Sequence, residues 1–534
     1  MISENINKLI FKIENYKIPD YLSFGHDERF LGAGKITSNA ARYYEKLRTA
    51  LDYKEEHLLR RSAIERILKR RITFGHSNDN IAKVLVFELL QAGYLPGAEL
   101  PEVVVERIQN IVEKNLLFMG YVKDASDNMT KPLIFDPKII GLAACEIEET
   151  LFLPILKEES VNTLYSIVAP SVHIVDSKIS DKEKYSQIYL ACHRSLLRSD
   201  KTQLFYKLWI MRNPDWFDIG SRSVSDSERL QKLAKDFNSV KVLLEGQLDH
   251  PLQTRLLSAL RDDSIYFLAI MGVLEKHHKN SREIFSDFDL LSKDIQDFIE
   301  RKYEEERHKT KKSSIRAIFY IFATKILLAF LIEMPYDLFI VGGVQYVALS
   351  VNVIFHPLFL FIVTRNTTVN GSDNTRKIID GVNNIVYSGK RKDISVKLKD
   401  KRGFLYYSAI FFYSLFFVIS FGGIIWLLDS LKFNFIAIGL FILFFTFVSF
   451  FGFRIRYIAR QWTVRRKDES ILSFLWDILT LPIVHMGRWL THKFSSINIF
   501  VFIMDFIIET PFKALLKVFD SFISFLREKK EEIY

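Results

Sequence analysis

Four long apolar runs in the second half of the chain constrain its fold more than any other feature. They lie near 315–334, 338–363, 404–428 and 433–453. Each run holds about 20 mostly apolar residues, the length that a helix needs to cross a bilayer. A backbone that crosses lipid must bond its N–H and C=O groups internally, which favours helices. The sequence therefore predicts an all-α membrane protein with four transmembrane helices.

The charge of the flanking segments predicts the orientation of these helices. Residues 1–300 carry 41 Lys/Arg and 44 Asp/Glu, whereas residues 301–534 carry 32 and 19. The basic residues gather before the first run, between the second and third, and after the fourth, but the other two connections hold almost none. By the positive-inside rule, this pattern predicts two hairpins in the cell (inner or plasma) membrane, with both termini and the middle loop in the cytosol.

The first 300 residues have the pattern of a cytosolic multi-helix domain. In "YKEEHLLRRSAIERILKRRI" one helical stripe is apolar, and two later helices are expected to meet at Ser199-Asp200. No cleavable signal peptide is recognisable at the start, and the two cysteines, Cys145 and Cys192, favour a reducing compartment. We expect no nucleic-acid partner, because this half has no excess of positive charge to offer phosphates.

Composition and periodicity divide the chain into six predicted segments. They are a helical cytosolic subdomain (1–120), a second one (121–300), a charged lead helix with the first transmembrane hairpin (301–363), a basic cytosolic loop (364–403), the second hairpin (404–453), and a basic segment with interfacial helices (454–534).

The C-terminal segment is expected to form amphipathic helices in the inner interface. The runs 471–490 and 497–508 are polar-interrupted or too short to span, although a third hairpin stays an alternative. After Thr510 and Pro511 comes one apolar stripe. This stripe fits either the membrane interface or the protein's own soluble domain.

Charged and polar residues inside the first two runs form the main candidate site. Lys325 sits in mid-span and Glu333 near the far end, while Gln345, Asn352 and His356 share one helical face of the second span. If the chain reverses near Gly342 and Gly343, His356 and Lys325 lie at the same depth in the bilayer to within about one helical turn. The sequence therefore predicts a polar seam of Lys325, Glu333, Gln345, Asn352 and His356. Such residues mark functional sites, but they also hold helices together.

The middle loop offers a second candidate site. A cluster of basic residues precedes the third span, and such clusters attract anionic lipid headgroups on the cytosolic face. Its members are Lys390, Arg391, Lys392, Lys397, Lys399, Lys401 and Arg402. The same charges also serve to set topology.

Motifs for chemistry are weak. "LGAGKIT" at 31–37 lacks the first glycine and the Ser/Thr of a phosphate loop. Glu146, Glu148 and Glu149 in "CEIEET" are expected to form a solvated helix face. We therefore expect no catalytic residue, metal or cofactor.

Three functions fit these observations. The first is a non-enzymatic scaffold, assembly factor or receptor at the inner membrane face, with a protein partner bound through residues 1–300. The second is an oligomeric ion or proton channel or transporter that uses the polar seam; a homo-oligomer stays open. The third is a lipid-directed enzyme with His356 or His485, which no motif supports.

Overall fold

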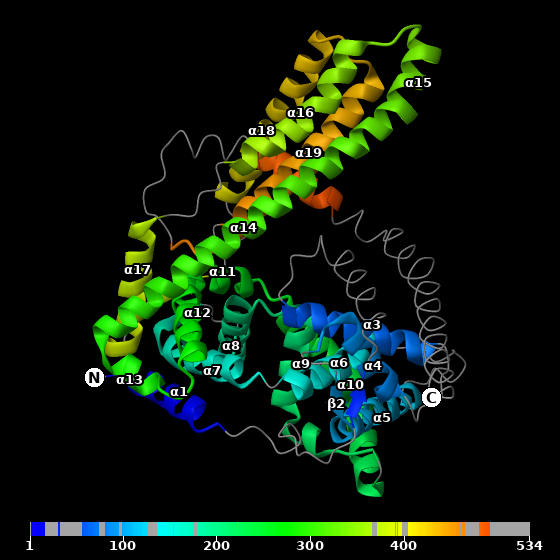
Figure 1. Ribbon diagram of the computed structural model, residues 1–534. Helices are drawn as coiled ribbons and strands as arrows, with labels where there is room; N and C mark the ends of the chain where they lie inside the picture. The colour runs from blue at the N-terminus through cyan, green and yellow to red at the C-terminus, as the bar shows by residue number, and fades with distance from the viewer. Residues whose placement is uncertain are drawn as a thin grey trace, which may run out of the picture. The chain divides into compact units, whose positions relative to one another are not determined.

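The computed structural model describes the chain in several stretches. They are residues 2–16, 30–32, 56–73, 81–95, 99–125, 136–152, 154–175, 179–221, 223–365, 371–389, 391, 393–397, 404–459, 461–464 and 480–491. The described chain is almost entirely helical (Figure 1), so the predicted all-α class is confirmed. The helices predicted for 497–508 and after Thr510 lie outside the described residues.

The chain divides into two compact units. Unit 1 consists of Met1–Ser286, Asn384–Leu398 and Ile507–Tyr534, and unit 2 of Asp287–Asn383 and Lys399–Phe506. This division is coarser than the six predicted segments. It also places 384–398, part of the predicted middle loop, with the N-terminal half of the chain.

Unit 1 is a multi-helix assembly with two very short sheets. Its helices are α1 (Glu4–Glu14), α3 (Glu56–Thr73), α4 (Ile81–Ala92), α5 (Glu102–Asp124), α6 (Pro137–Phe152), α7 (Ile155–Val168), η3 (Ala169–Ser171), α8 (Asp181–Leu197), α9 (Lys201–Arg212), η4 (Pro214–Asp218), α10 (Val224–Leu248), α11 (Leu252–Ala259), α12 (Arg261–Lys276), α13 (Ser281–Ser286) and η7 (Asn384–Ser388). The predicted junction at Ser199-Asp200 is confirmed, because Asp200 caps α9 by accepting from the Gln203 N–H.

Two apolar clusters among the described residues form a large part of the core of unit 1. The first gathers the buried faces of α3, α4, α5 and α6. The second joins α5, α9 and α10 through four aromatic rings in tilted and edge-on contact, Phe118, Trp209, Trp216 and Phe237. Helices α5 and α6 contribute to both clusters, so they join the two parts of the unit.

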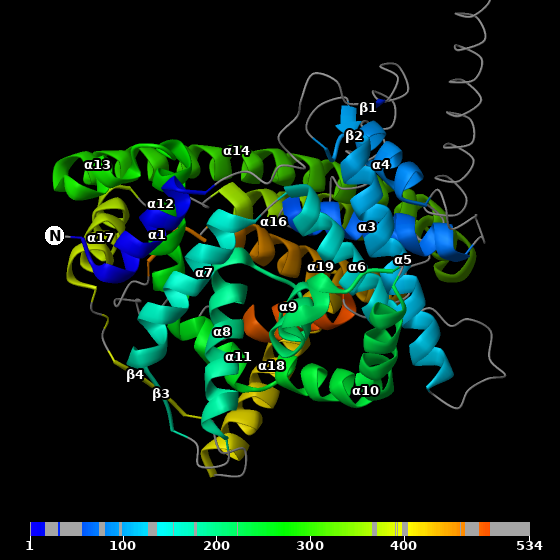
Figure 2. The same ribbon diagram turned by 90° about the horizontal axis from the view of Figure 1, so that it is seen from below.

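The strands of unit 1 pair in twos. Strand β1 (Phe30–Gly32) runs antiparallel to β2 (Glu99–Pro101). Strand β3 (Val172–Val175) runs parallel to β4 (Ile394–Lys397), and Figure 2 shows the two side by side. The β3–β4 pair joins residues more than 200 positions apart, on either side of the first two apolar spans.

Unit 2 contains the apolar helices together with shorter and more polar ones. They are α14 (Phe288–Leu328), η5 (Ala329–Glu333), α15 (Met334–Tyr336), η6 (Asp337–Val341), α16 (Tyr346–Arg365), α17 (Ser372–Asn383), α18 (Phe404–Ser430) and α19 (Phe435–Ala459). Residues 480–491 are also helical.

Four helices of unit 2 are long and apolar enough to cross a membrane, as predicted. They are the continuous helix 288–341 and the helices over 346–365, 406–430 and 435–457. Helices α14, α16 and α19 pack together, and α18 packs against α19. Large side chains such as Phe319, Phe330 and Phe339 are exposed on them. An apolar surface of this kind indicates a membrane protein.

Helix 480–491 packs against two of these helices. The Tyr413 hydroxyl of α18 lies 3.1 Å from Nδ1 of His485. The Gly487 backbone lies against α19 at Thr446. Thr446 precedes Arg454, the first basic residue after the fourth apolar run, by eight residues, or about 12 Å along the helix. Interfacial helices lie about 5–10 Å into the headgroup boundary. The interfacial placement predicted for 471–490 is therefore not confirmed and stays a prediction.

We expect Gly487→Ala to loosen this packing. A Cβ at Gly487 would lie 2.1 Å from the Thr446 carbonyl oxygen, so the helices would have to separate. Overpacking of this kind costs about 1–3 kcal/mol, which thermal unfolding in detergent would detect. Gly439→Ala in α19 is the control, because no described atom lies within 4 Å of its Cβ position. Equal midpoints for the two variants would contradict the close approach.

Candidate functional site

The polar seam begins at Lys325, deep in the apolar part of α14. Its side chain is only 1% exposed. The ammonium donates to Oδ1 of Asn352 on α16, at 2.6 Å, and lies 4.3 Å from the ring centroid of Phe444 on α19. A buried ammonium needs such partners, because it has left water. Lys325 thus contacts two other apolar helices.

Glu333 joins the seam because the helix is not regular there. In an α-helix, position i+8 is rotated by about 80° from position i. Here η5 is a π-helical segment, in which each turn holds more residues than an α-helical turn. The extra residue brings Glu333, eight positions after Lys325, close to the direction that the seventh position takes in a regular α-helix. Pro335 lacks an N–H for the carbonyl of Leu331 in that segment, which accounts for the irregularity. As a result, Asn352 Nδ2 donates to Glu333 Oε1 at 2.6 Å.

His356 lies one turn further along α16 and is fully buried. Its Nδ1 is 3.0 Å from the Asn352 carbonyl oxygen and its Nε2 is 3.1 Å from that of Phe441 on α19. A neutral ring carries one N–H and therefore satisfies one carbonyl at a time. The ring also packs against Phe441, with the centroids 4.7 Å apart.

Gln345 takes part through its backbone, and its partner was missed from the sequence. Its N–H donates to Oδ2 of Asp337 at 3.0 Å, and Asn434 Nδ2 donates to Oδ1 of the same carboxylate at 2.5 Å. Asp337 is buried. It thus ties the turn that follows Gly342 (φ +84°) to the start of α19. The available signal was its position four residues after Glu333, on the same helical face.

The seam as a whole joins α14, α16 and α19. Lys325, Asn352 and Glu333 form one continuous chain of hydrogen bonds, and His356 bonds to the Asn352 backbone. The depth predicted for His356 relative to Lys325 agrees with this geometry. Satisfied polar groups of this kind fix helices in one arrangement. Ion passage along the seam stays a prediction.

The predicted lipid-contact cluster is described only in part. Arg391 belongs to unit 1. Its Nε donates to Oδ1 of Asp263 at 3.0 Å, and its Nη2 lies 2.6 Å from Oδ2 of the same carboxylate. The same nitrogen donates to the Ala259 carbonyl oxygen at 3.2 Å. The Arg391 guanidinium is therefore engaged inside the protein. The backbone of Lys397 ends β4, while Lys390, Lys392, Lys399, Lys401 and Arg402 lie outside the described residues.

The α6 carboxylates do not form the solvated face that we expected. Glu146 accepts from Lys114 at 2.5 Å and from the Trp216 indole at 3.0 Å. Glu148 pairs with Arg60 at 3.1 Å, and all these groups are buried. The expectation is wrong because cations from α3 and α5 neutralise α6 inside the core. No local sequence pattern reveals such pairing.

Glu149 belongs to a second buried ionic group. Lys207 bridges Glu149 at 2.6 Å and Glu158 at 2.9 Å. Burial, opposed by Lys207 and reinforced by Glu158, raises the pKa of Glu149 to about 7. In Glu158, burial is outweighed by His193 and Lys207, which lower its pKa to about 2. The two carboxyl groups therefore respond to pH in opposite ways.

This difference gives a pH test. Because the folded pKa of Glu149 is above its usual 4.5, the folded state holds an extra proton between about pH 4.5 and 7. The stability that Glu149 contributes is therefore fully present below pH 4.5 and is lost as the pH rises to 7. The loss in the free energy of unfolding is about 3 kcal/mol. Denaturant unfolding should show that Glu149→Gln becomes more stable relative to the native chain as the pH is raised from about 4.5 to 7. A difference that does not vary with pH would contradict the assignment.

Glu158 of this group also lies near a histidine, which in turn contacts a serine. Ser199 Oγ is 2.7 Å from His193 Nδ1, and His193 Nε2 is 3.5 Å from Glu158 Oε1. The order resembles a nucleophile–base–acid chain. However, both side chains are buried, His193 in α8 and Ser199 at the turn between α8 and α9. We assign the three residues to holding that turn.

The described residues contain no group of three or more His, Cys, Asp or Glu side chains able to hold a metal ion. Comparisons with protein families, curated proteins and solved structures find no match to this chain.

Proposed function

We propose that the chain is a non-enzymatic scaffold or receptor that is anchored in the cell membrane by unit 2 and offers unit 1 to a protein partner in the cytosol. In this proposal the polar seam holds the membrane helices together, and both termini and the middle loop face the cytosol. Anionic lipids would contact the basic residues near the spans.

The observation that carries the proposal is the way the chain connects its two units. It passes between them after residues 286, 383, 398 and 506. The segment that enters unit 1 between the second and third spans pairs as β4 with β3 and is fixed by Arg391 and Asp263. A domain fastened through several spans is suited to being held at a membrane or to transmitting its state there.

Helix α14 supports the receptor form of this proposal. It begins at Phe288, two residues after unit 1 ends in the chain, and its 41 residues run past Lys325 to Leu328, about 61 Å at 1.5 Å per residue. Asn374 on α17 donates to the Tyr303 hydroxyl at 2.5 Å and to the Trp462 carbonyl oxygen at 2.7 Å, which braces the polar part of α14. A braced helix of this length is suited to carrying a displacement of its first turns to the seam.

Photo-cross-linking in native membranes tests the proposal. A benzoylphenylalanine placed at Val224 or Val242, both exposed on α10 of unit 1, should yield a covalent product of defined mass with another protein. The same probe at Phe339, exposed on the apolar unit, is the control and should give lipid adducts. Adducts with lipid or with the chain itself alone, at every unit 1 position, would contradict a scaffold or receptor.

The second candidate function is an oligomeric channel or transporter for ions or protons. The observation in its favour is that Lys325, Asn352 and Glu333 form a continuous buried polar chain. Ionisable residues at such positions often mark a transport path. Flux measurements separate the two candidates.

A further inference from the structure

Helix α1 contacts two segments of unit 1 that adjoin unit 2 in the chain, α13 and residues 384–389. Its buried stripe consists of Ile6, Leu9, Ile10 and Ile13. Through it, α1 packs against α7 and against α13, the last helix of unit 1 before α14 begins. The N–H of Arg282, in α13, donates to Glu14 Oε1 at 2.9 Å. The C-terminal end of α1 is therefore fastened to the segment that leads into the first span.

The N-terminal end of α1 is fastened to the returning segment. The Ser3 N–H donates to the Val386 carbonyl oxygen at 2.7 Å, and Ser3 Oγ donates to the Ile385 carbonyl oxygen at 3.1 Å. Gly389 has φ +61°, and a Cβ there would lie 3.0 Å from the Ser3 Cβ. Residues 384–389 come directly from α17 and lead to β4. One short helix thus contacts the outgoing and the returning connection.

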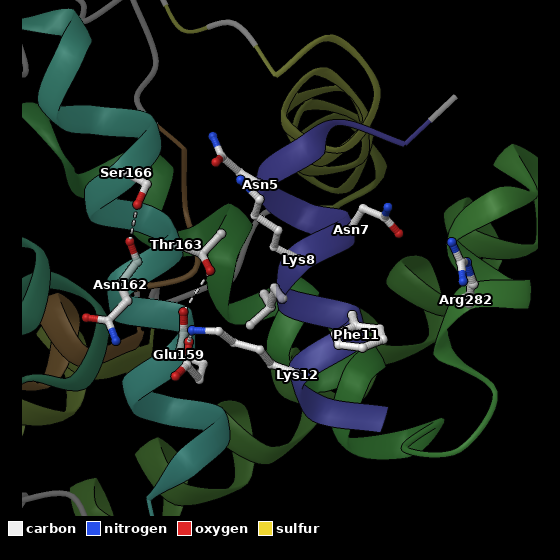
Figure 3. A pocket seen from close by; sticks show the side chains of 11 residues that line it. Asn5, Asn7, Lys8, Phe11, Lys12, Glu159, Asn162, Thr163, Ser166 and Arg282 are labelled. Atoms are coloured by element: carbon white, nitrogen blue, oxygen red, sulfur yellow. Dashed lines mark hydrogen bonds and ion pairs between the residues drawn. The ribbon is translucent and has the colours of Figure 1, made fainter. Parts of the chain in front are cut away.

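The opposite side of α1 is open. A groove of about 440 Å³ flanks the helix, and Figure 3 shows Lys12 reaching across it to Glu159 of α7, at 2.6 Å. Phe11, on the outer side, is 62% exposed. Exposed ion pairs such as Lys12–Glu159 add little stability. The helix is therefore held by its apolar stripe and its two ends.

Helix α1 is too short to persist as a helix once it leaves this place. It has 11 residues, and helices shorter than about 12–15 residues are marginal in water when alone. If α1 leaves its place it therefore unfolds, and the contacts at Ser3 and Glu14 are lost together. Docking of α1 is thus an order–disorder equilibrium, a common basis of conformational switches.

We infer that α1 is a detachable strap, whose docking holds residues 384–389 and helix α13 in fixed relation within unit 1. With the strap docked, these two segments move as one; with it detached, 384–389 loosens. The consequence for signalling rests on the proposed function, but the strap itself does not.

Hydrogen exchange of the full chain in nanodiscs tests the strap directly. Ile10→Asp places a charge in the buried stripe, and Phe11→Asp places the same charge on the exposed side of the same helix. In Ile10→Asp, amides of 281–286 and 384–389 should exchange at least about tenfold faster, while α5 stays at the native rate. Phe11→Asp should match the native chain throughout. Native rates at 384–389 in Ile10→Asp, with α1 itself exchanging freely, would overturn the inference.

If Ile10→Asp also accelerates α5, Ser3→Pro decides the question. Ser3 has φ −62°, which proline adopts without strain, so this variant removes the N–H and the hydroxyl that bind residues 385 and 386 but leaves the stripe intact. It should raise exchange at 384–389 several-fold, whereas Ser3→Ala, which keeps the N–H, should raise it less. Equal and native exchange in both variants would overturn the strap. Neither result depends on a protein partner, so failure of the strap and failure of the proposed function are separate outcomes.

Discussion

Replacing Asn352 with leucine should destabilise unit 2 more than any other single change in the seam. Asn352 Oδ1 accepts from Lys325 and its Nδ2 donates to Glu333. Asn352→Leu leaves an ammonium and a carboxylate buried without their hydrogen-bond partner. Breaking a buried ionic arrangement in this way costs about 3–5 kcal/mol. The measurement is the free energy of unfolding in detergent micelles by denaturant titration.

Two controls make this result interpretable. Ser350→Leu is the same kind of change at an exposed position of α16 and should alter stability by less than about 0.5 kcal/mol. The triple variant Lys325→Met/Glu333→Leu/Asn352→Leu removes the whole charged group and should recover most of the loss, because apolar replacements of buried ion pairs are often neutral. If Asn352→Leu is as stable as Ser350→Leu, the seam does not hold the helices.

The second large effect is expected at Arg391. Its bidentate contact with Asp263 is mostly buried, with side chains 8% and 13% exposed. Arg391→Ala leaves the Asp263 carboxylate without its counter-charge. We expect this to lower the free energy of unfolding of unit 1 by about 3–5 kcal/mol. The double variant Arg391→Ala/Asp263→Ala should lose less than the sum of the single changes, since the two residues are in contact. Arg229→Ala, exposed on α10, is the matched control.

The pH dependence of the Arg391→Ala penalty has a definite sign. Burial, partly opposed by Arg391, raises the pKa of Asp263. Without the guanidinium that pKa rises further, so the folded variant takes up a proton at higher pH than the native chain. Protonated Asp263 has no unpaired charge. The penalty measured near pH 4 should therefore be smaller than that near pH 7, and a larger penalty at low pH would contradict the ion pair.

The sequence predicts the apolar part of this fold well because its signals are local. Span length and the reversal near Gly342 follow from hydropathy and backbone chemistry. The same holds for most of the apolar stripe that the spacing predicts in α3, which consists of Leu59, Ala63, Ile64, Ile67 and Leu68. All of these are buried except Leu59, which is half-buried. Yet Arg60 and Arg61 are buried in the same helix. They pair with Glu148 and Asp200, which are far away in the chain, so no local pattern could reveal them.

The candidate site shows the same division. Lys325, Glu333, Asn352 and His356 were recognisable because charge is expensive in an apolar run. Asp337 was missed although it stands four residues after Glu333, because the sequence places it in the connection between two spans. In the structure, π-helical segments continue the helix through that connection. The docking of 384–397 on unit 1 was equally hidden. A parallel strand pair between residues more than 200 positions apart depends on tertiary contacts that periodicity does not encode.

Flux through reconstituted liposomes tests the central claim, that the seam is structural and the protein is an anchored scaffold or receptor. The native chain should move protons and K⁺ across the bilayer no faster than protein-free liposomes do under an imposed potential. Lys325→Met and His356→Ala, at matched insertion, should give the same baseline. Flux in the native chain that both variants abolish, and that Ser350→Leu leaves intact, would contradict the claim and make the seam a transport path.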